Sequence, residues 1–347
     1  MLSKQLDQNL GEGAVGVQAA RDVTVNVGLS FSEVHTIATM VFKEDFVRML
    51  DHAGVLAEAR AERILNQYLE RVEALNLDIR HQAQDPDFRY VLFLAQKAAA
   101  RSGSENLQNV LVDLLVVRSQ QPSLSLTQLV LNDAIEVVPR ITSGQINVLI
   151  VAVVFRRIFF SGIATFDSFL KVMDIYLKPF LNDLPTSPGS IMHLIQAGCG
   201  APEDPSKLGS VLQQQYPGIF QLGVSDTDVR IKGLSAVARG LLVPCDNNPR
   251  LLKVMGATSS MFVEICKQTK ISDSESEMLD HVFHGTAMSV SAIKERCITA
   301  RPYLADLFDI WDKSKLKTFV PSNVGLAIAH ACLQQHGQLE PLSHWVE

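Results

Sequence analysis

The chain has 347 residues, of which 47% are hydrophobic and 20% are charged, and its formal net charge is −6. This length exceeds a typical domain of roughly 100–200 residues and therefore predicts two domains. The negative charge argues against a main surface that binds nucleic-acid phosphates, so nucleic acid is not an expected partner. Five scattered cysteines and a polar N-terminus without an apolar signal-peptide core predict a cytoplasmic protein.

Residues 11–27 predict a short β-ribbon. Valine occupies alternate positions, at Val15 and Val17 and again at Val23 and Val25, and this is the period of a strand. A ribbon of this length is not stable by itself in water. Pairing with the same ribbon of neighbouring subunits would bury the valines and satisfy the backbone. We therefore expect a homo-oligomer whose interface contains Val15, Val17, Val23 and Val25.

Helical periodicity dominates the sequence after this ribbon. Ser30 and Glu33 have the spacing of a capping box, Asp85-Pro86 marks a second helix start, and Thr142 or Ser143 a third. Helices are predicted over residues 34–50, 58–72, 88–100, 105–118, 124–138 and 166–181. The apolar side chains expected in the core are Phe42, Phe46, Leu65, Leu69, Leu111, Leu115, Val148 and Phe155.

Residues 146–163 form the most apolar stretch of the chain. A membrane span requires about 20 mostly apolar residues, and Arg156 and Arg157 interrupt this stretch near its centre. Each arginine costs roughly 2.5–3.5 kcal/mol on the insertion scale. A buried core helix is therefore the predicted structure, while a buried strand and a membrane-contacting segment remain the alternatives.

Residues 198–205 read Gly-Cys-Gly-Ala-Pro-Glu-Asp-Pro and predict an exposed linker. Beyond them the sequence predicts helices over 206–216, 226–242, 250–268, 272–283, 289–299, 303–311 and 323–336, with a short strand at 316–320. The predicted fold is mainly α-helical, a two-lobed multi-helical body with a short N-terminal β-ribbon. Its predicted parts are an oligomerisation ribbon over 1–28, an N-terminal helical domain over 29–197, a linker over 198–205 and a C-terminal helical domain over 206–347.

Two groups of polar side chains are candidates for a chemical site. Glu277, Asp280, His281 and His284 are three or four residues apart, a spacing that places them near one helix face where a divalent metal could bind. The zinc-protease pattern His-Glu-x-x-His is absent, however, and polar residues on a helix surface are the favoured interpretation of the group. His330, His336 and His344 are spread over a helix and a tail without an evident carboxylate partner.

Two sequence motifs suggest ligands but do not satisfy the structural context that each requires. Gly11, Gly13 and Gly16 have the spacing of a dinucleotide fingerprint, yet they precede the predicted strand instead of following it. Lys313, Lys315 and Lys317 precede a strand and helix like those that end a winged-helix module, which leaves a nucleic-acid-binding regulator as an alternative. The sequence therefore predicts no catalytic residue, no cofactor and no metal.

Two stretches, one near each end of the chain, form distinctive motifs. The first is Gln-Asn-Leu-Gly-Glu-Gly-Ala at residues 8–14 with Val-Gln-Ala-Ala-Arg-Asp-Val at 17–23, which continues into 28–34. The second is residues 319–329, with Val-Gly-Leu-Ala-Ile-Ala at 324–329, closed by Leu-Ser-His-Trp-Val at 342–346. Both resemble a family of bacterial proteins associated with phage-defence and mobile-element loci. Family members carry Leu-Thr-Ser before the Val-Gly, where this chain has Val-Pro-Ser-Asn at 320–323. The resemblance implies a context in bacterial immunity and no particular reaction.

The sequence and this resemblance together predict a non-enzymatic, homo-oligomeric sensor or effector of an anti-phage defence system. Its expected partners are other copies of itself and a partner protein or small signalling ligand from the same locus. The alternatives are an effector that associates with the membrane on activation, where residues 146–163 would perturb the bilayer, and the winged-helix-like regulator.

Overall fold

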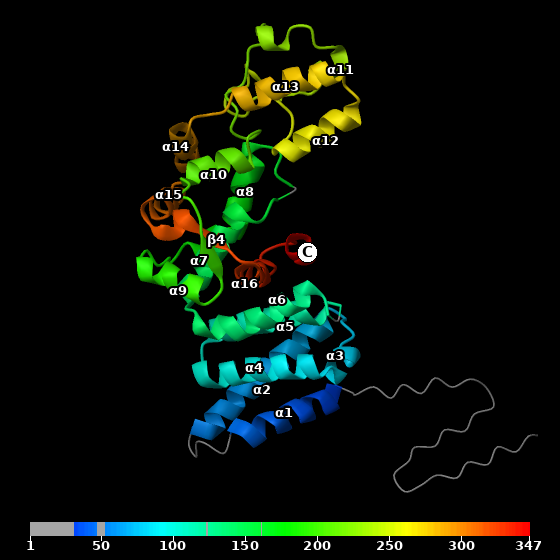
Figure 1. The fold of residues 1–347 in the computed structure, drawn as a ribbon, viewed down its shortest axis with the longest axis vertical. Helices are drawn as coiled ribbons and strands as arrows, with labels where there is room; N and C mark the ends of the chain where they lie inside the picture. Colours follow the sequence, from blue (N-terminus) through cyan, green and yellow to red (C-terminus); the bar gives the residue numbers. More distant parts are fainter. Residues whose placement is uncertain (1–30, 47–52, 123, 161) are drawn as a thin grey trace, which may run out of the picture.

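The computed structural model describes residues 31–46, 53–122, 124–160 and 162–347 (Figure 1). These residues form a mainly α-helical, multi-helical fold with two small two-stranded sheets, which confirms the predicted fold class. The predicted ribbon, including Val15, Val17, Val23 and Val25, lies outside the described residues.

The first half of the described chain is a stack of helices. They are α1 (Phe31–Phe46), α2 (Ala53–Ala74), α3 (Arg80–Gln84), α4 (Pro86–Ser102), α5 (Glu105–Ser119) and α6 (Leu126–Val137), followed by the short 3₁₀ helix η2 (Val138–Arg140). Local chemistry explains where they begin and end. The carboxylate of Asp85 accepts a hydrogen bond from the Asp87 amide at the start of α4, and Gly103 ends that helix with a φ of 64°, a conformation that glycine adopts at little cost.

The second half contains shorter helices and four short strands. The helices are α7 (Ser143–Arg156), α8 (Phe166–Tyr176), η3 (Lys178–Phe180), α9 (Pro188–Gln196), α10 (Leu208–Gln215), η4 (Val229–Ile231), α11 (Ala236–Arg239), α12 (Ser259–Thr269), α13 (Asp273–Gly285), α14 (Val290–Ala300), α15 (Leu304–Lys313), η5 (Lys315–Thr318), α16 (Asn323–Leu333) and α17 (Ser343–Val346). The strands are β1 (Gly200–Pro202), β2 (Leu242–Pro244), β3 (Leu252–Val254) and β4 (Phe319–Pro321).

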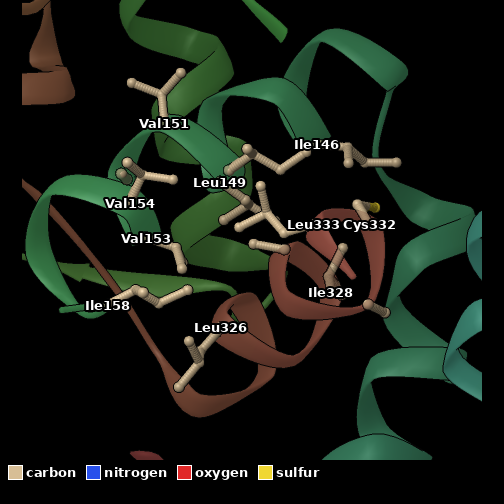
Figure 2. Close-up of a cluster of buried hydrophobic side chains, with 14 of the residues drawn as sticks. Ile146, Leu149, Val151, Val153, Val154, Ile158, Leu326, Ile328, Cys332 and Leu333 are labelled. Carbon is tan, nitrogen blue, oxygen red and sulfur yellow. The ribbon is translucent and has the colours of Figure 1, made fainter. Parts of the chain in front are cut away.

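Helix α7 lies at the centre of the main core and packs against α16 (Figure 2). Thr142 begins α7 with a capping box, in which its hydroxyl accepts from the Gln145 amide and its own amide donates to the Gln145 side chain. Every side chain from 148 to 155 is buried. The predicted core helix is therefore present up to Arg156, and the strand alternative for this part is wrong; the described residues after it, predicted as helix up to 163, lie outside α7. Within the described ranges, none of the helices combines the length and apolar character that a membrane span requires.

The two arginines of this stretch connect the end of α7 to distant parts of the chain. Arg156 donates to the Glu203 carboxylate at 2.8 Å and to the Lys317 carbonyl at 2.8 Å. Arg157 donates to the Pro321 carbonyl at 2.8 Å and to the Asn323 side chain at 3.0 Å. These charge-assisted hydrogen bonds connect the end of α7 to residues 203 and 317–323.

The segment 198–205 differs from the predicted linker. Residues Gly200–Pro202 form β1, which pairs antiparallel with β4 so that Gly200 lies opposite Pro321. The Phe319 ring occupies the space that a side chain at Gly200 would need, so glycine here permits a close approach of two backbones. The buried hydrophobic cluster also continues across this segment, with Leu194 before it and Leu208 after it. The predicted boundary therefore does not coincide with a break in the core.

Two of the predicted helices in the second half are wrong, because glycines and a hairpin interrupt them. The stretch 226–242 forms η4, α11 and the start of β2, and Gly233 within it has a φ of 93°. The stretch 250–268 begins as β3, which pairs with β2, and turns at Gly256 with a φ of 109° before α12 begins. An α-helix cannot contain residues with such positive φ angles. These elements and α13 surround a second, smaller core; α11, α12 and α13 lie together at the top of Figure 1.

Most of the predicted core residues are buried. Phe42, Leu65, Leu111, Leu115, Val148 and Phe155 are each at most 3% exposed, and Leu69 is partly buried. The side chain of Phe46 is outside the described set. The periodicity of the sequence thus identified the buried faces of α2, α5 and α7 correctly.

Candidate functional site

The polar group on α13 is spread over an exposed helix face. Glu277, Asp280, His281 and His284 are all exposed, and His284 lies 3.4 Å from the Asp280 carboxylate. Among the described residues, no cluster of three or more His, Cys, Asp or Glu side chains is arranged to hold a metal ion. The structure thus shows one contact within the group, between His284 and Asp280, and the four described side chains do not converge on a common metal position.

The lysines of the winged-helix alternative are held by contacts near their own helix. Lys313 pairs with Asp309 at 2.7 Å, and Lys317 donates to the Asp312 carbonyl at 3.0 Å. Strand β4 pairs with β1, more than 100 residues earlier in the chain, whereas the wing of such a module is a hairpin. The strand–helix pair therefore closes the main core.

A cavity of about 1160 Å³ lies where three separate parts of the chain meet. One wall comes from α2 and α5, a second from residues 158–160, Gly162 and α8, and a third from the end of α16 and the segment that follows it. The residues that line it are Arg71, Ala74, Leu75, Asp113, Val116, Gln120, Ile158, Phe159, Phe160, Gly162, Val172, Tyr176, Ala331, Gln334, Gln335, His336, Gly337, Gln338, Leu339, Glu340 and Trp345. Their positions in the chain span 275 residues, so folding alone brings them together.

Asp113 is the central charged group of this cavity. It projects from the apolar helix α5 and is 5% exposed. Its carboxylate accepts from the Arg71 guanidinium at 2.8 Å and from the side-chain amide of Gln335. Burial raises the pKa of Asp113 to about 6, because the desolvation of the carboxylate outweighs the attraction of Arg71. A buried carboxyl group with a raised pKa in a cavity is a candidate functional group.

The third wall is a polar segment with the sequence Gln-Gln-His-Gly-Gln at 334–338. The hydroxyl of Tyr176 donates to the Gln338 carbonyl at 3.2 Å, and Nε2 of the buried His330 lies 2.9 Å from the Glu340 carbonyl. Tyr176 also occupies the space that a side chain at Gly337 would need. These contacts fix the backbone of the segment against α8 and α16 while the amide side chains at 334, 335 and 338 remain exposed.

Of the three C-terminal histidines, His336 lies in this wall, and the other two lie outside the lining of the cavity. His336 lines the cavity and packs edge-on against the Phe180 ring, with 4.9 Å between the ring centres. His344 lies 3.6 Å from the Glu340 carboxylate, a partner that was not evident from the sequence. His330 is fully buried behind the wall.

Asp113 and the amide-rich wall were missed at the sequence level, although both leave a signal. Asp113 is the one charged residue within the apolar run Val-Leu-Val-Asp-Leu-Leu-Val-Val at 110–117, and a lone carboxylate on a buried helix needs a partner. The run of amides at 334–338 directly follows the apolar α16. Neither signal shows that Asp113 and the amides at 334–338 lie beside each other, and only the structure shows that they do.

Replacing Asp113 by Asn is expected to remove a contribution to stability that decreases between about pH 4 and 6, so the slope of stability against pH should be more positive in the variant than in the wild type. The pKa of Asp113 is raised from 3.8 to about 6 in the folded chain, so between these values the folded protein keeps a proton that the unfolded chain has lost. The contribution of Asp113 to stability should therefore fall as the pH rises through this window. Asparagine does not titrate and removes this contribution.

Urea denaturation of both proteins at several pH values measures the difference, with the exposed Asp133→Asn as control. An unchanged slope in Asp113→Asn would contradict the raised pKa.

The described structure is thus a mainly α-helical protein with a large mixed polar and aromatic cavity. One protein-family model, with the description ":-like", matches residues 28–346, which is 319 of the 347 residues. The chain belongs to this family. No curated protein and no solved structure matches the chain.

Proposed function

We propose that this chain is a non-enzymatic, homo-oligomeric sensor or effector of a bacterial anti-phage defence system, and that the cavity receives the ligand to which it responds. The observation that carries this proposal is the composition of the cavity. Its walls belong to the N-terminal helices α2 and α5, to α8 and to the segment after α16. A ligand that contacts all three walls would bind most tightly to one arrangement of these parts and would stabilise that arrangement. A sensor requires such a difference in affinity between conformations.

The defence context of this proposal is supported by the resemblance of residues 8–34 and 319–346 to proteins of phage-defence loci. It is tested by phage challenge of bacteria that carry the locus, with variants that block the cavity. Ala74 is exposed at the end of α2 and lines the cavity, so Ala74→Trp fills space there without disturbing the core. Ala59 is exposed on the same helix away from the cavity, and Ala59→Trp is the matched control.

We expect fewer plaques with the wild type and with Ala59→Trp than with Ala74→Trp or with a strain that lacks the gene. Far-UV circular dichroism of the purified variants confirms that both fold. Equal plaque counts for the wild type and the strain lacking the gene, across a broad phage panel, would contradict a defence role. Protection that Ala74→Trp retains in full would contradict a sensing role for the cavity.

The oligomeric part of the proposal has its own prediction. Val23→Asp combined with Val25→Asp is expected to reduce the solution mass, because two charged side chains would have to be buried where valines pair. Light scattering after size exclusion measures the mass, and far-UV circular dichroism should show nearly unchanged helicity. A wild type that is monomeric at micromolar concentration, or a double variant with the wild-type mass, would contradict the predicted interface.

A further inference from the structure

The polar groups of the cavity offer donors and acceptors side by side. Gln120, Gln334 and Gln338 are exposed amides on its walls, and no contact described above engages their side chains. Each amide presents one acceptor oxygen and two donor hydrogens. Side-chain amides pair in this two-point way with the edges of nucleobases, which also carry adjacent donors and acceptors.

Aromatic and apolar side chains face the same space. Phe159 is 57% exposed although it is a large apolar residue, and Leu75 across the cavity is 52% exposed. Phe160 lies against the Tyr176 ring with 4.9 Å between centres, and the partly buried Trp345 also lines the cavity. An exposed phenyl ring beside unengaged amides suits a planar ligand, which stacks on the ring while its edge forms hydrogen bonds.

The charge of the cavity distinguishes between ligands of this shape. Arg71 is the one Lys or Arg among the described residues that line it, and its guanidinium is paired with Asp113 at 2.8 Å. Glu340 adds a carboxylate close to His344. A triphosphate requires several unpaired cations or a helix N-terminus directed at it, and the lining does not supply such a set of cations. The cavity therefore favours an uncharged ligand.

We infer that the cavity binds an uncharged, planar nitrogen heterocycle of the nucleobase class, as the free base or the nucleoside. This inference deepens the proposed sensing function and rests on its assignment of the cavity as the ligand site. The volume of about 1160 Å³ accommodates such a ligand, since pockets for small molecules are roughly 300–1000 Å³. The base stacks on the exposed Phe159 ring, and the side-chain amides of the polar segment 334–338 form hydrogen bonds with its edge.

The test is a titration of the full chain with adenosine, guanosine, cytidine and uridine, and with their 5′-triphosphates. Trp345 lines the cavity and Trp311 is buried in the core, so the change in tryptophan emission reports on the cavity, and calorimetry measures the affinity independently. We expect saturable binding of at least one nucleoside, with an affinity no weaker than that of its triphosphate. The Trp345→Phe variant should lose most of the emission change and still show binding by calorimetry.

Three variants test whether the nucleoside binds in the cavity. Phe159→Ala should weaken nucleoside binding by about tenfold or more, as expected for a lost stacking partner. Tyr90→Ala removes an aromatic ring that is 59% exposed on α4 and does not line the cavity, so it should bind like the wild type. Ala74→Trp should abolish binding. If no nucleoside binds, if the triphosphates bind more tightly, or if Phe159→Ala and Tyr90→Ala behave alike, the inference is overturned.

The outcome of the nucleoside titration can be distinguished from the outcome of the phage challenge. Nucleoside binding without any protection against phage would support this inference and contradict the defence role. Protection that depends on the cavity, combined with no nucleoside binding, would support the sensing role and overturn the ligand class.

Discussion

Replacing Leu149 by Ala is expected to lower the free energy of unfolding by about 2–5 kcal/mol, because it removes a fully buried side chain from the centre of the main core. Leu149 projects from α7 toward α16 among the side chains of Figure 2. The surrounding helices are fixed by caps and by the arginine contacts, so they cannot collapse fully into the space. Urea denaturation followed by far-UV circular dichroism measures the loss as a shift of the midpoint.

Leu124→Ala is the control for this measurement. Leu124 is 89% exposed, and a surface substitution of this kind changes stability by about 0.5 kcal/mol or less. If the two variants unfold at the same urea concentration, α7 does not occupy the centre of the core.

Replacing Gly325 by Ala is the second change with a large expected effect, a loss of about 1–3 kcal/mol or more. Gly325 lies in the first turn of α16, where an added methyl group would overlap the carbonyl oxygen of Cys199 and crowd the side chain of Leu149. Backbone atoms cannot move aside as the end of a flexible side chain can. The helix would have to shift away from β1 and α7, which opens the core on both sides.

Gly189→Ala provides the matched comparison. Gly189 is in the first turn of α9, and no atom lies within 4 Å of the position that its methyl group would take. Alanine is a better helix former than glycine by roughly 1 kcal/mol, so this variant should be as stable as the wild type or slightly more stable. Thermal denaturation of the two variants in parallel provides the measurement. A Gly325→Ala protein as stable as Gly189→Ala would show that α16 and Cys199 are farther apart than the structure places them.

The sequence was most informative where structure depends on local chemistry. Period and capping residues predicted α4, α5, α7 and α13, since a helix start needs only a side-chain acceptor near its first free amides. The same local signals failed around Gly233 and Gly256, because apolar residues near helical spacing also occur in short strands. The Gly/Pro segment at 198–205 was predicted as a linker because glycine and proline are typical of loops, whereas Gly200 is needed here for the close approach of β1 to β4.

The candidate cavity was beyond what local patterns predict. Asp113, Arg71 and Gln335 are separated by 42 and 222 residues along the chain, and no periodicity connects positions so far apart. Asp113 is accommodated in an apolar helix because its carboxylate accepts hydrogen bonds from Arg71 of α2 and from Gln335, which follows the end of α16.

The sequence by itself determined that this protein is mainly α-helical, where most helices begin, and that residues 146–156 form a buried helix, because each of these properties follows from side chains within a few turns of one another. Only the tertiary structure decided that β1 and β4 pair, that Arg156 and Arg157 satisfy carbonyl groups of the C-terminal part, and that three distant walls enclose one cavity. These contacts depend on the directions in which whole helices pack, and packing directions arise from the sum of many weak side-chain contacts instead of from any single motif.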